Sequence, residues 1–177
     1  SIDKFDYAAD SLIAAEWVPM NEETHPPLMG NAGEQQVAVF PANFSELKDW
    51  RLFWDRKVKL NLLGYDRLIF EAKVEDQEVL SGVILYLQAG DGWYALPSFG
   101  LTENWKEVEI WLEQATVEGT PLGLDQVENI RFALLPGTKK DSRVLVKNFK
   151  AISGLGLDDI GRISTYPDYA AAVADIK

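Results

Sequence analysis

Alternation of apolar and polar residues is the feature that most constrains how this chain can fold, because it recurs in segment after segment. In residues 67–74, which read RLIFEAKV, every second residue from Leu68 onward is apolar. Residues 57–62 and 107–112 repeat the same period of two. Such alternation is typical of a β-strand that buries one face. These segments are therefore predicted to be strands of sheets with one buried side.

Further strand candidates and the turns between them extend this pattern over most of the chain. They are residues 36–40, 82–88, 93–96, 128–135 and 143–151, separated by turn signals at 63–66, 90–92, 118–121 and 136–137. Many short strands with few helices indicate a sandwich or a barrel. The long connections at 41–56 and 113–127 favour a jelly roll over a meander. We therefore expect an all-β jelly-roll β-sandwich of two antiparallel sheets with about eight strands, or nine if residues 2–5 pair.

The expected order of strands divides them between two sheets. One sheet would contain 57–62, 128–135, 82–88 and 93–96, and the other would contain 36–40, 143–151, 67–74 and 106–112. Short peripheral helices are predicted near 8–16, 123–127 and 167–176. The sandwich is expected to occupy residues 1–152. Residues 153–177, which contain three glycines, are expected to form a linker and a C-terminal helix.

Net charge argues against two classes of partner, although residues 46–73, with 7 basic and 5 acidic residues, could still form a basic patch. The chain has 28 acidic and 17 basic residues and a formal charge of −11. Nucleic acids and anionic membranes both require a positively charged footprint. We therefore expect no nucleic acid and no membrane as partner. Six Trp and six Tyr in an acidic chain suit either a neutral polar ligand such as a sugar or an ordinary large core.

The side chains available for catalysis are few. The chain has no Cys, which excludes disulfides and thiolate chemistry, and His25 is its only histidine, which excludes sites built from several histidines. Glu107 and Glu109 share the outward face of one strand, about 6.5–7 Å apart, a separation found in glycosidase carboxylate pairs. An outward strand face is also an ordinary place for solvated Glu. We therefore predict that the chain is not an enzyme.

Several runs of this sequence resemble those of a known protein family. They are RLFWDRKVKLNLLGYDRLIFEAKV, GVILYLQAGDGWYALPSF, NWKEVEIWLE, EGTPLGLDQVENIRFALLP and VLVKNFKAI. Together they resemble the galactose-binding-like β-sandwich found as carbohydrate-binding modules of bacterial glycoside hydrolases, over about residues 2–152. The resemblance implies a non-catalytic accessory domain of a larger secreted polysaccharide-degrading enzyme, located in the extracellular space or the periplasm. Its implied partners are an oligo- or polysaccharide and an adjacent catalytic domain of the same polypeptide.

The resemblance also implies a structural calcium ion between the first strand and an acidic pair in the last. Here Lys147 and Asn148 stand where that pair is expected. A Lys ammonium can take the place of a cation beside Asp3 or Asp6. We therefore expect no cofactor, and the two substitutions disfavour a full calcium site.

Strand parity selects candidate ligand-binding residues. It directs Tyr86, Gln88 and Arg131 outward from one sheet, together with one ring of the pair Trp93 and Tyr94. An aromatic ring can stack on the apolar face of a pyranose while Arg and Gln bind its hydroxyl groups. The alternative is that another segment covers this face, which the outward residues Ala133 and Leu135 favour.

Two more tryptophans, Trp50 and Trp54, lie in the long connection before residue 57. Either could line a ligand site at the end of the sandwich, and Trp54 could instead anchor the core. A second function remains open, in which the chain is a structural β-sandwich domain that packs against a catalytic domain and binds no free ligand. Outward Trp111 and the C-terminal helix would then form the contact.

Overall fold

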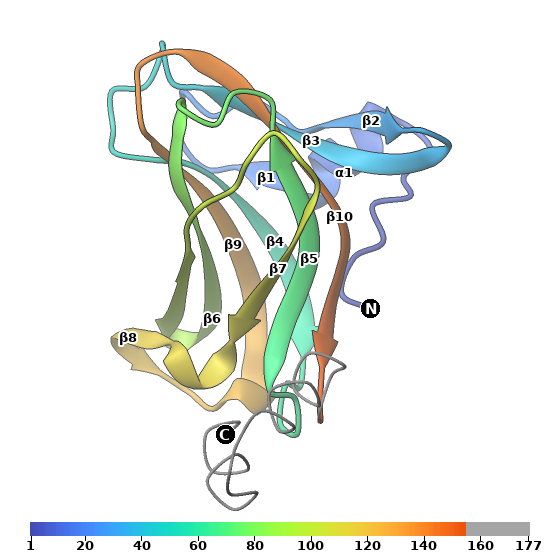
Figure 1. Ribbon diagram of the computed structural model, residues 1–177. Coiled ribbons are helices and arrows are strands. Elements are labelled where there is room, and N and C mark those ends of the chain that lie inside the picture. Colours follow the sequence, from blue (N-terminus) through green and yellow to red (C-terminus); the bar gives the residue numbers. More distant parts are fainter. Residues whose placement is uncertain (155–177) are drawn as a thin grey trace, which may run out of the picture.

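Two antiparallel sheets face one another in the computed structural model, which describes residues 1–154 (Figure 1). We name them the β6 sheet and the β5 sheet. The β6 sheet contains, in spatial order, β1 (Val18–Pro19), β4 (Leu52–Leu60), β9 (Val127–Pro136), β6 (Leu80–Ser98) and β8 (Thr116–Pro121). The β5 sheet contains β2 (Leu28–Ala32), β3 (Gln35–Asn43), β10 (Asp141–Ile152), β5 (Arg67–Val74) and β7 (Lys106–Trp111). The predicted all-β sandwich and its division into two sheets are confirmed.

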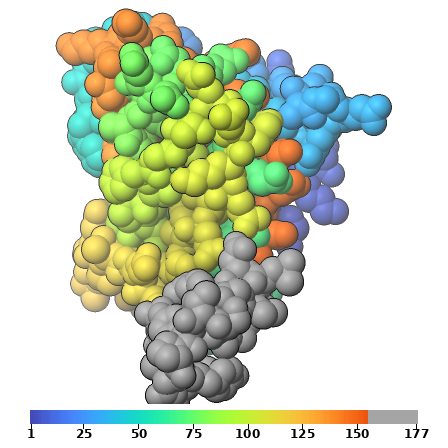
Figure 2. Space-filling model, viewed as in Figure 1, coloured from blue at the N-terminus to red at the C-terminus, as the bar shows by residue number. Residues whose placement is uncertain are grey.

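Within residues 1–154 there are ten strands, where about eight were predicted. The additional strands, β1, β2 and β8, all lie at sheet edges. Most residues of β8 are exposed, so this strand has no buried face to produce an alternating sequence. It forms because β6 offers it a row of backbone partners, and sequence periodicity alone therefore could not detect it. The β2–β3 hairpin, light blue in Figure 2, stands out from the body of the molecule.

The segment Gly90-Asp91-Gly92, predicted as a tight turn, lies inside a single 19-residue strand. The first half of β6 pairs with β9, and its second half pairs with β8 from Gly90 onward. Gly90 has a φ of +61°, a conformation that bends the strand there. A Cβ on Gly92 would lie 2.2 Å from the Pro121 nitrogen, so the two backbones can approach only because this residue is glycine. The prediction that 93–96 pairs with 82–88 is therefore wrong.

The strand predicted at 57–62 begins five residues earlier, at Leu52. This places Leu52 and Trp54 inward, both fully buried, and sends Phe53 and Asp55 to the outer face. The prediction missed this start because Phe53 is apolar on the outward side, which breaks the alternation. The correction matters for function, because it places Phe53 and Asp55 on the outer side of β4, directly after Trp50 and Arg51.

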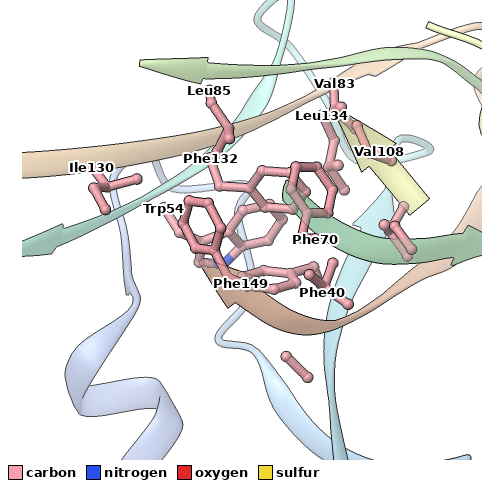
Figure 3. Close-up of a cluster of buried hydrophobic side chains, with 14 of the residues drawn as sticks. Phe40, Trp54, Phe70, Val83, Leu85, Val108, Ile130, Phe132, Leu134 and Phe149 are labelled. Carbon is pink, nitrogen blue, oxygen red and sulfur yellow. The ribbon is translucent and has the colours of Figure 1, made fainter. Parts of the chain in front are cut away.

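Aromatic rings fill the middle of the core. The ring centroid of Phe132 of β9 lies 4.9 Å from that of Phe40 of β3, and both rings also contact Trp54 (Figure 3). Phe70 and Phe149 continue this contact along the β5 sheet. These rings come from β3, β4, β5, β9 and β10, so the two sheets are held together by interlocked edge-to-face contacts.

Short helices and the N-terminal segment close the ends of the sandwich. The predicted helices appear as α1 (Asp10–Glu16) and the 3-10 turn η2 (Leu124–Gln126), and a further turn, η1 (Leu112–Gln114), follows β7. Asp3 forms an isolated antiparallel bridge with Phe149, so residues 2–5 do not form a full ninth strand. The helix predicted at 167–176 and most of the predicted linker lie outside the described residues. Within residues 1–154, no helix is long and apolar enough to cross a membrane.

Candidate functional site

The outer face of the β6 sheet gathers the polar and aromatic residues that strand parity selected. Across three strands, Asp55 of β4 lies opposite Arg131 of β9, which lies opposite Tyr86 of β6. Gln88 follows on the same side of β6. Trp93 turns to this face and contacts Tyr86 edge-to-face at 6.2 Å. We call this surface the β6 face.

A buried carboxylate fixes the central arginine. Arg131 donates from Nε to Asp55 Oδ1 at 2.6 Å and from an Nη to Oδ2 at 2.8 Å. The Asn129 amide also donates to Oδ2, at 2.9 Å, and contacts the Gln88 oxygen at 3.4 Å. Asp55 is only 8% exposed. A bidentate pair of this kind holds the guanidinium plane in one orientation.

Arg131 in turn orders the rings beside it. Its guanidinium carbon lies 4.3 Å from the Trp93 ring centroid and 4.7 Å from that of Phe53. Cation–π contacts of this length restrain an aromatic side chain without burying it completely, and Trp93 remains half-buried. The β6 face therefore presents a prearranged indole next to an oriented guanidinium.

A second arginine extends the stack toward the end of the sheet. The guanidinium carbon of Arg51 lies 4.4 Å from the centroids of both Trp50 and Phe53, and 5.1 Å from that of Tyr86. Trp50 is 54% exposed, so its ring is open to a ligand. The order of groups along the face is thus Trp50, Arg51, Phe53, Arg131 and Trp93.

The centre of the face is closed by its own side chains. Tyr86 is 4% exposed, and its ring packs with Ala95 and Ala133 beneath Trp93 and Arg51. Burial raises the pKa of the Tyr86 hydroxyl, since the phenolate would be poorly solvated there. Tyr86 therefore supports the neighbouring groups and offers no stacking surface of its own. The small second core that Ala133 suggested is present, and side chains of the face itself build it.

Two of the predicted ligand-binding residues point into the sandwich. Trp54 is fully buried and donates its indole N–H to the His25 carbonyl at 2.8 Å. Tyr94 packs against the main core and donates its hydroxyl to the Leu122 carbonyl. Neither ring presents a face to the outer side of the β6 sheet. Of the adjacent pair, Trp93 is the ring directed outward.

Sequence reasoning missed three residues that matter to the β6 face: Arg51, Phe53 and Asp55. All three were assigned to a connection whose side-chain directions could not be deduced. An earlier strand start would have revealed them, because inward Leu52 and Trp54 alternate with Phe53 and Asp55. Asn129 was also missed, although its position on β9 two residues before Arg131 places it on the same side.

The place expected for calcium contains an arginine. Asp3 is buried and its carboxylate accepts from the Phe5 amide, the Tyr7 hydroxyl at 2.7 Å and the Trp17 indole at 2.9 Å. An Nη of Arg56 lies 3.3 Å from the same carboxylate. The donor set does not fit a calcium ion, since Arg56 already neutralises Asp3 and would repel a cation.

Lys147, expected beside Asp3 or Asp6, lies elsewhere, and that expectation is wrong. Its ammonium is 3.6 Å from Glu71 and 4.5 Å from the Trp105 ring centroid. Among residues 1–154, no group of three or more His, Asp or Glu is arranged to hold a metal ion.

The outer face of the β5 sheet has a different character. Glu107 lies directly opposite Glu71, and Glu109 lies 3.6 Å from Arg67. A groove of about 670 Å³ runs beside Glu71 and Glu107 and is also lined by Gln35, Gln36, Asn148 and Lys150. It contains amides and charges but no exposed aromatic ring. Stacking on a sugar is therefore possible on the β6 face and not in this groove.

Several solved structures of other proteins have a similar fold. It resembles the family 11 carbohydrate-binding module of the cellulase Lic26A-Cel5E of Clostridium thermocellum, with a TM-score of 0.65, 13% identity, and coverage of 88% of this chain and 94% of that one. A family 11 module from the same organism in complex with a β-1,3-1,4-mixed-linked tetrasaccharide gives a TM-score of 0.62 at 15% identity, covering 86% and 94%. Part of an exo-β-agarase gives 0.63 at 8% identity, covering 87% of this chain and 25% of that chain.

No family model matches the sequence, and no curated protein matches it either. At these identities the structural likeness establishes the fold alone. The chain therefore has the β-sandwich fold seen in carbohydrate-binding modules.

Proposed function

We propose that this chain is a non-catalytic carbohydrate-binding module that holds a glycan on the β6 face. The observation that carries the proposal is the prearranged stack in which Asp55 fixes Arg131 and Arg131 fixes Trp93. An indole held beside an oriented guanidinium provides the two kinds of contact that a bound sugar makes. Its ring stacks on the C–H face of a pyranose, and the guanidinium and neighbouring amide donate to hydroxyl groups.

The ends of the stack supply the contact surface. Trp50 is the most exposed tryptophan ring on the face, and Trp93 lies at the other end of the stack. Gln88, which is half-buried, provides a hydrogen-bonding amide on the face. Asn129, only 1% exposed, lies beneath it and holds the Gln88 oxygen and Asp55 in place. Because the side chains are already ordered, binding would cost little conformational entropy.

The biological setting follows from the same proposal. A module of this fold has been solved with a mixed-linked tetrasaccharide bound, and another forms a quarter of an exo-β-agarase chain. The present chain would act as an accessory domain of a larger secreted polysaccharide-degrading enzyme. It would keep an adjacent catalytic domain close to its polymer, without taking part in the reaction.

Affinity electrophoresis against a panel of polysaccharides tests the proposal. The panel contains mixed-linked β-glucan, cellulose derivatives, agarose, polygalacturonate and carrageenan. We expect retardation by at least one polymer, and loss of that retardation in Trp93→Ala. Trp111→Ala is the matched control, because that indole stacks on Arg67 of the β5 sheet instead and should leave retardation unchanged. Migration unaffected by every polymer would contradict the proposal.

A second function, a structural domain that packs against a catalytic domain, is favoured by one observation. The middle of the β6 face has no open cleft, because Tyr86 and Ala133 are buried there, and Trp50 is left as an exposed ring that a neighbouring domain could cover. Acrylamide quenching separates the two functions. If the chain is a docking domain, acrylamide should quench Trp50 less in the full polypeptide than in the isolated domain. Glycans should then change the quenching of neither protein.

A further inference from the structure

The two arginines of the β6 face differ in one respect that bears on ligand choice. Arg131 is neutralised by Asp55 through two hydrogen bonds. Arg51 has no carboxylate partner within ion-pair distance among the described residues. The side chain of Tyr86, whose hydroxyl is a neutral group, lies beside its guanidinium. The face therefore carries one balanced guanidinium and one unbalanced one.

The surroundings of Arg51 make this imbalance costly. Three rings crowd its guanidinium, at 4.4 Å for Trp50 and Phe53 and 5.1 Å for Tyr86. Its Nε is buried and has no hydrogen-bond acceptor in the part of the chain that the structure describes. The rings partly offset the lost hydration through cation–π attraction, but they accept no conventional hydrogen bond from the edge of the guanidinium. A planar fork of donors in this state fits a ligand that brings its own acceptor oxygens.

The charges on the β4 side of the face favour an anionic acceptor, whereas the carboxylate of Glu118 lies on the β8 side, opposite Trp93. Asp55, four residues beyond Arg51 in the sequence, is already bonded to Arg131 and Asn129. Asp49 precedes Trp50, but its carboxylate accepts the Trp50 backbone N–H. Lys57, two residues beyond Asp55 on the same strand face, is exposed and adds positive charge. The β4 side of the face is thus locally cationic on a chain whose formal charge is −11.

We propose that Arg51 recognises a negatively charged substituent of the glycan, a carboxylate of a uronic acid or a sulfate ester. This inference rests on the proposed function and names its substrate class. Two anionic oxygens meet the two Nη groups of Arg51, since its Nε is buried, while the sugar ring that bears them stacks on exposed Trp50. Carboxylate and sulfate share this geometry, since each offers two oxygens to the fork.

Calorimetric titration of the full chain with two matched pairs of oligosaccharides tests this inference. Agarose oligosaccharides are compared with carrageenan oligosaccharides, which add sulfate to a galactan, and oligogalacturonate is compared with its methyl ester, which has the same sugars and linkages without the carboxylate charge. We expect an acidic member to bind at least about tenfold more tightly than its neutral counterpart, because charge-assisted hydrogen bonds exceed neutral ones. Which acidic member binds separates sulfate from carboxylate. The preference should weaken as salt is raised.

Three variants assign the preference to Arg51. Arg51→Gln should lose it, about tenfold or more on the acidic ligand, while a neutral ligand changes by less than about threefold. Arg51→Lys keeps the charge without the fork and should recover only part of the loss. Lys150→Gln removes an equal charge from the exposed outer face of the β5 sheet and should have no effect. Circular dichroism confirms that each variant is folded.

The outcomes separate the inference from the proposed function. Binding of neutral glycans with no preference for acidic ones would overturn the role of Arg51 and leave the carbohydrate-binding module intact. A preference that survives Arg51→Gln would also overturn it. Absence of binding to all four probes, together with no retardation in the polysaccharide panel, would contradict the proposed function as well.

Discussion

Removal of the Asp55 carboxylate should destabilise the fold strongly, because this group is the acceptor on which the β6 face depends. In Asp55→Ala, Arg131 loses two hydrogen bonds and Asn129 loses one. The side chains of Arg131 and Asp55 are 17% and 10% exposed, so little water can replace the lost acceptor. The variant leaves a guanidinium in a largely dry site without a counter-charge.

The size of the effect follows from this burial. Breaking a buried ion pair by deleting one partner costs about 3–5 kcal/mol. Partial access of water to Arg131 places the expected loss near the lower end, about 3 kcal/mol of unfolding free energy. For a chain of this size, that corresponds to a fall in Tm of about 6–12 °C. Urea unfolding followed by tryptophan fluorescence measures the loss, and a scan of circular dichroism against temperature measures the Tm.

An exposed pair of the same chemistry provides the control. Arg143 also forms a bidentate contact, with Glu75, but both side chains are largely in water. Glu75→Ala should cost less than about 1 kcal/mol. If Asp55→Ala and Glu75→Ala cost the same, within about 0.5 kcal/mol, the carboxylate does not have the structural role assigned to it.

Other changes probe the core, the ends of the sandwich and the long strand. Phe132→Ala should cost about 3–5 kcal/mol in urea unfolding, since its ring contacts those of Phe40 and Trp54, and a loss below about 1 kcal/mol would contradict that packing. Gly92→Ala should cost about 1–3 kcal/mol because the added carbon meets the Pro121 backbone, and unchanged stability would show that β6 and β8 are not in close contact. Burial and the hydrogen bond to Asp3 raise the pKa of Tyr7 from its ordinary value of 10.0, so its contribution is present below pH 10.0 and is lost as pH rises beyond it. Tyr7→Phe should flatten the alkaline fall in stability measured by urea unfolding at successive pH values, and an unaltered slope would contradict this reasoning.

Alternation predicted the architecture well where a strand has one buried side. Residues 67–74 and 107–112 show it plainly, and both became strands of the β5 sheet. The same rule directed Tyr86 and Arg131 to one face, where they lie as direct neighbours across β6 and β9. It failed at β8, whose side chains are mostly exposed, because an edge strand with no buried face leaves no periodic signal.

The composition of the candidate site was harder to predict than its location. Phe53 and Arg51 stack on one another at the outer surface, and an outward aromatic next to inward Leu52 resembles a continuous apolar run. Two glycines around Asp91 resemble a turn, whereas here one bends a strand and the other admits a neighbouring backbone. The burial of Tyr86 depends on how side chains from three strands pack over it, which no local pattern records.

The six tryptophans offer the most direct test of the central claim that a glycan binds on the β6 face. Trp50 and Trp93 lie on that face, Trp17 and Trp54 are buried in the core, and Trp105 and Trp111 contact cations of the β5 sheet. A nitrogen–proton correlation spectrum of the labelled chain resolves their indole signals while a retarding glycan is added. We expect the signals of Trp50 and Trp93 to shift with the titration and those of Trp17 and Trp54 to stay in place. Shifts confined to Trp105 or Trp111 would locate binding on the opposite sheet and contradict the account.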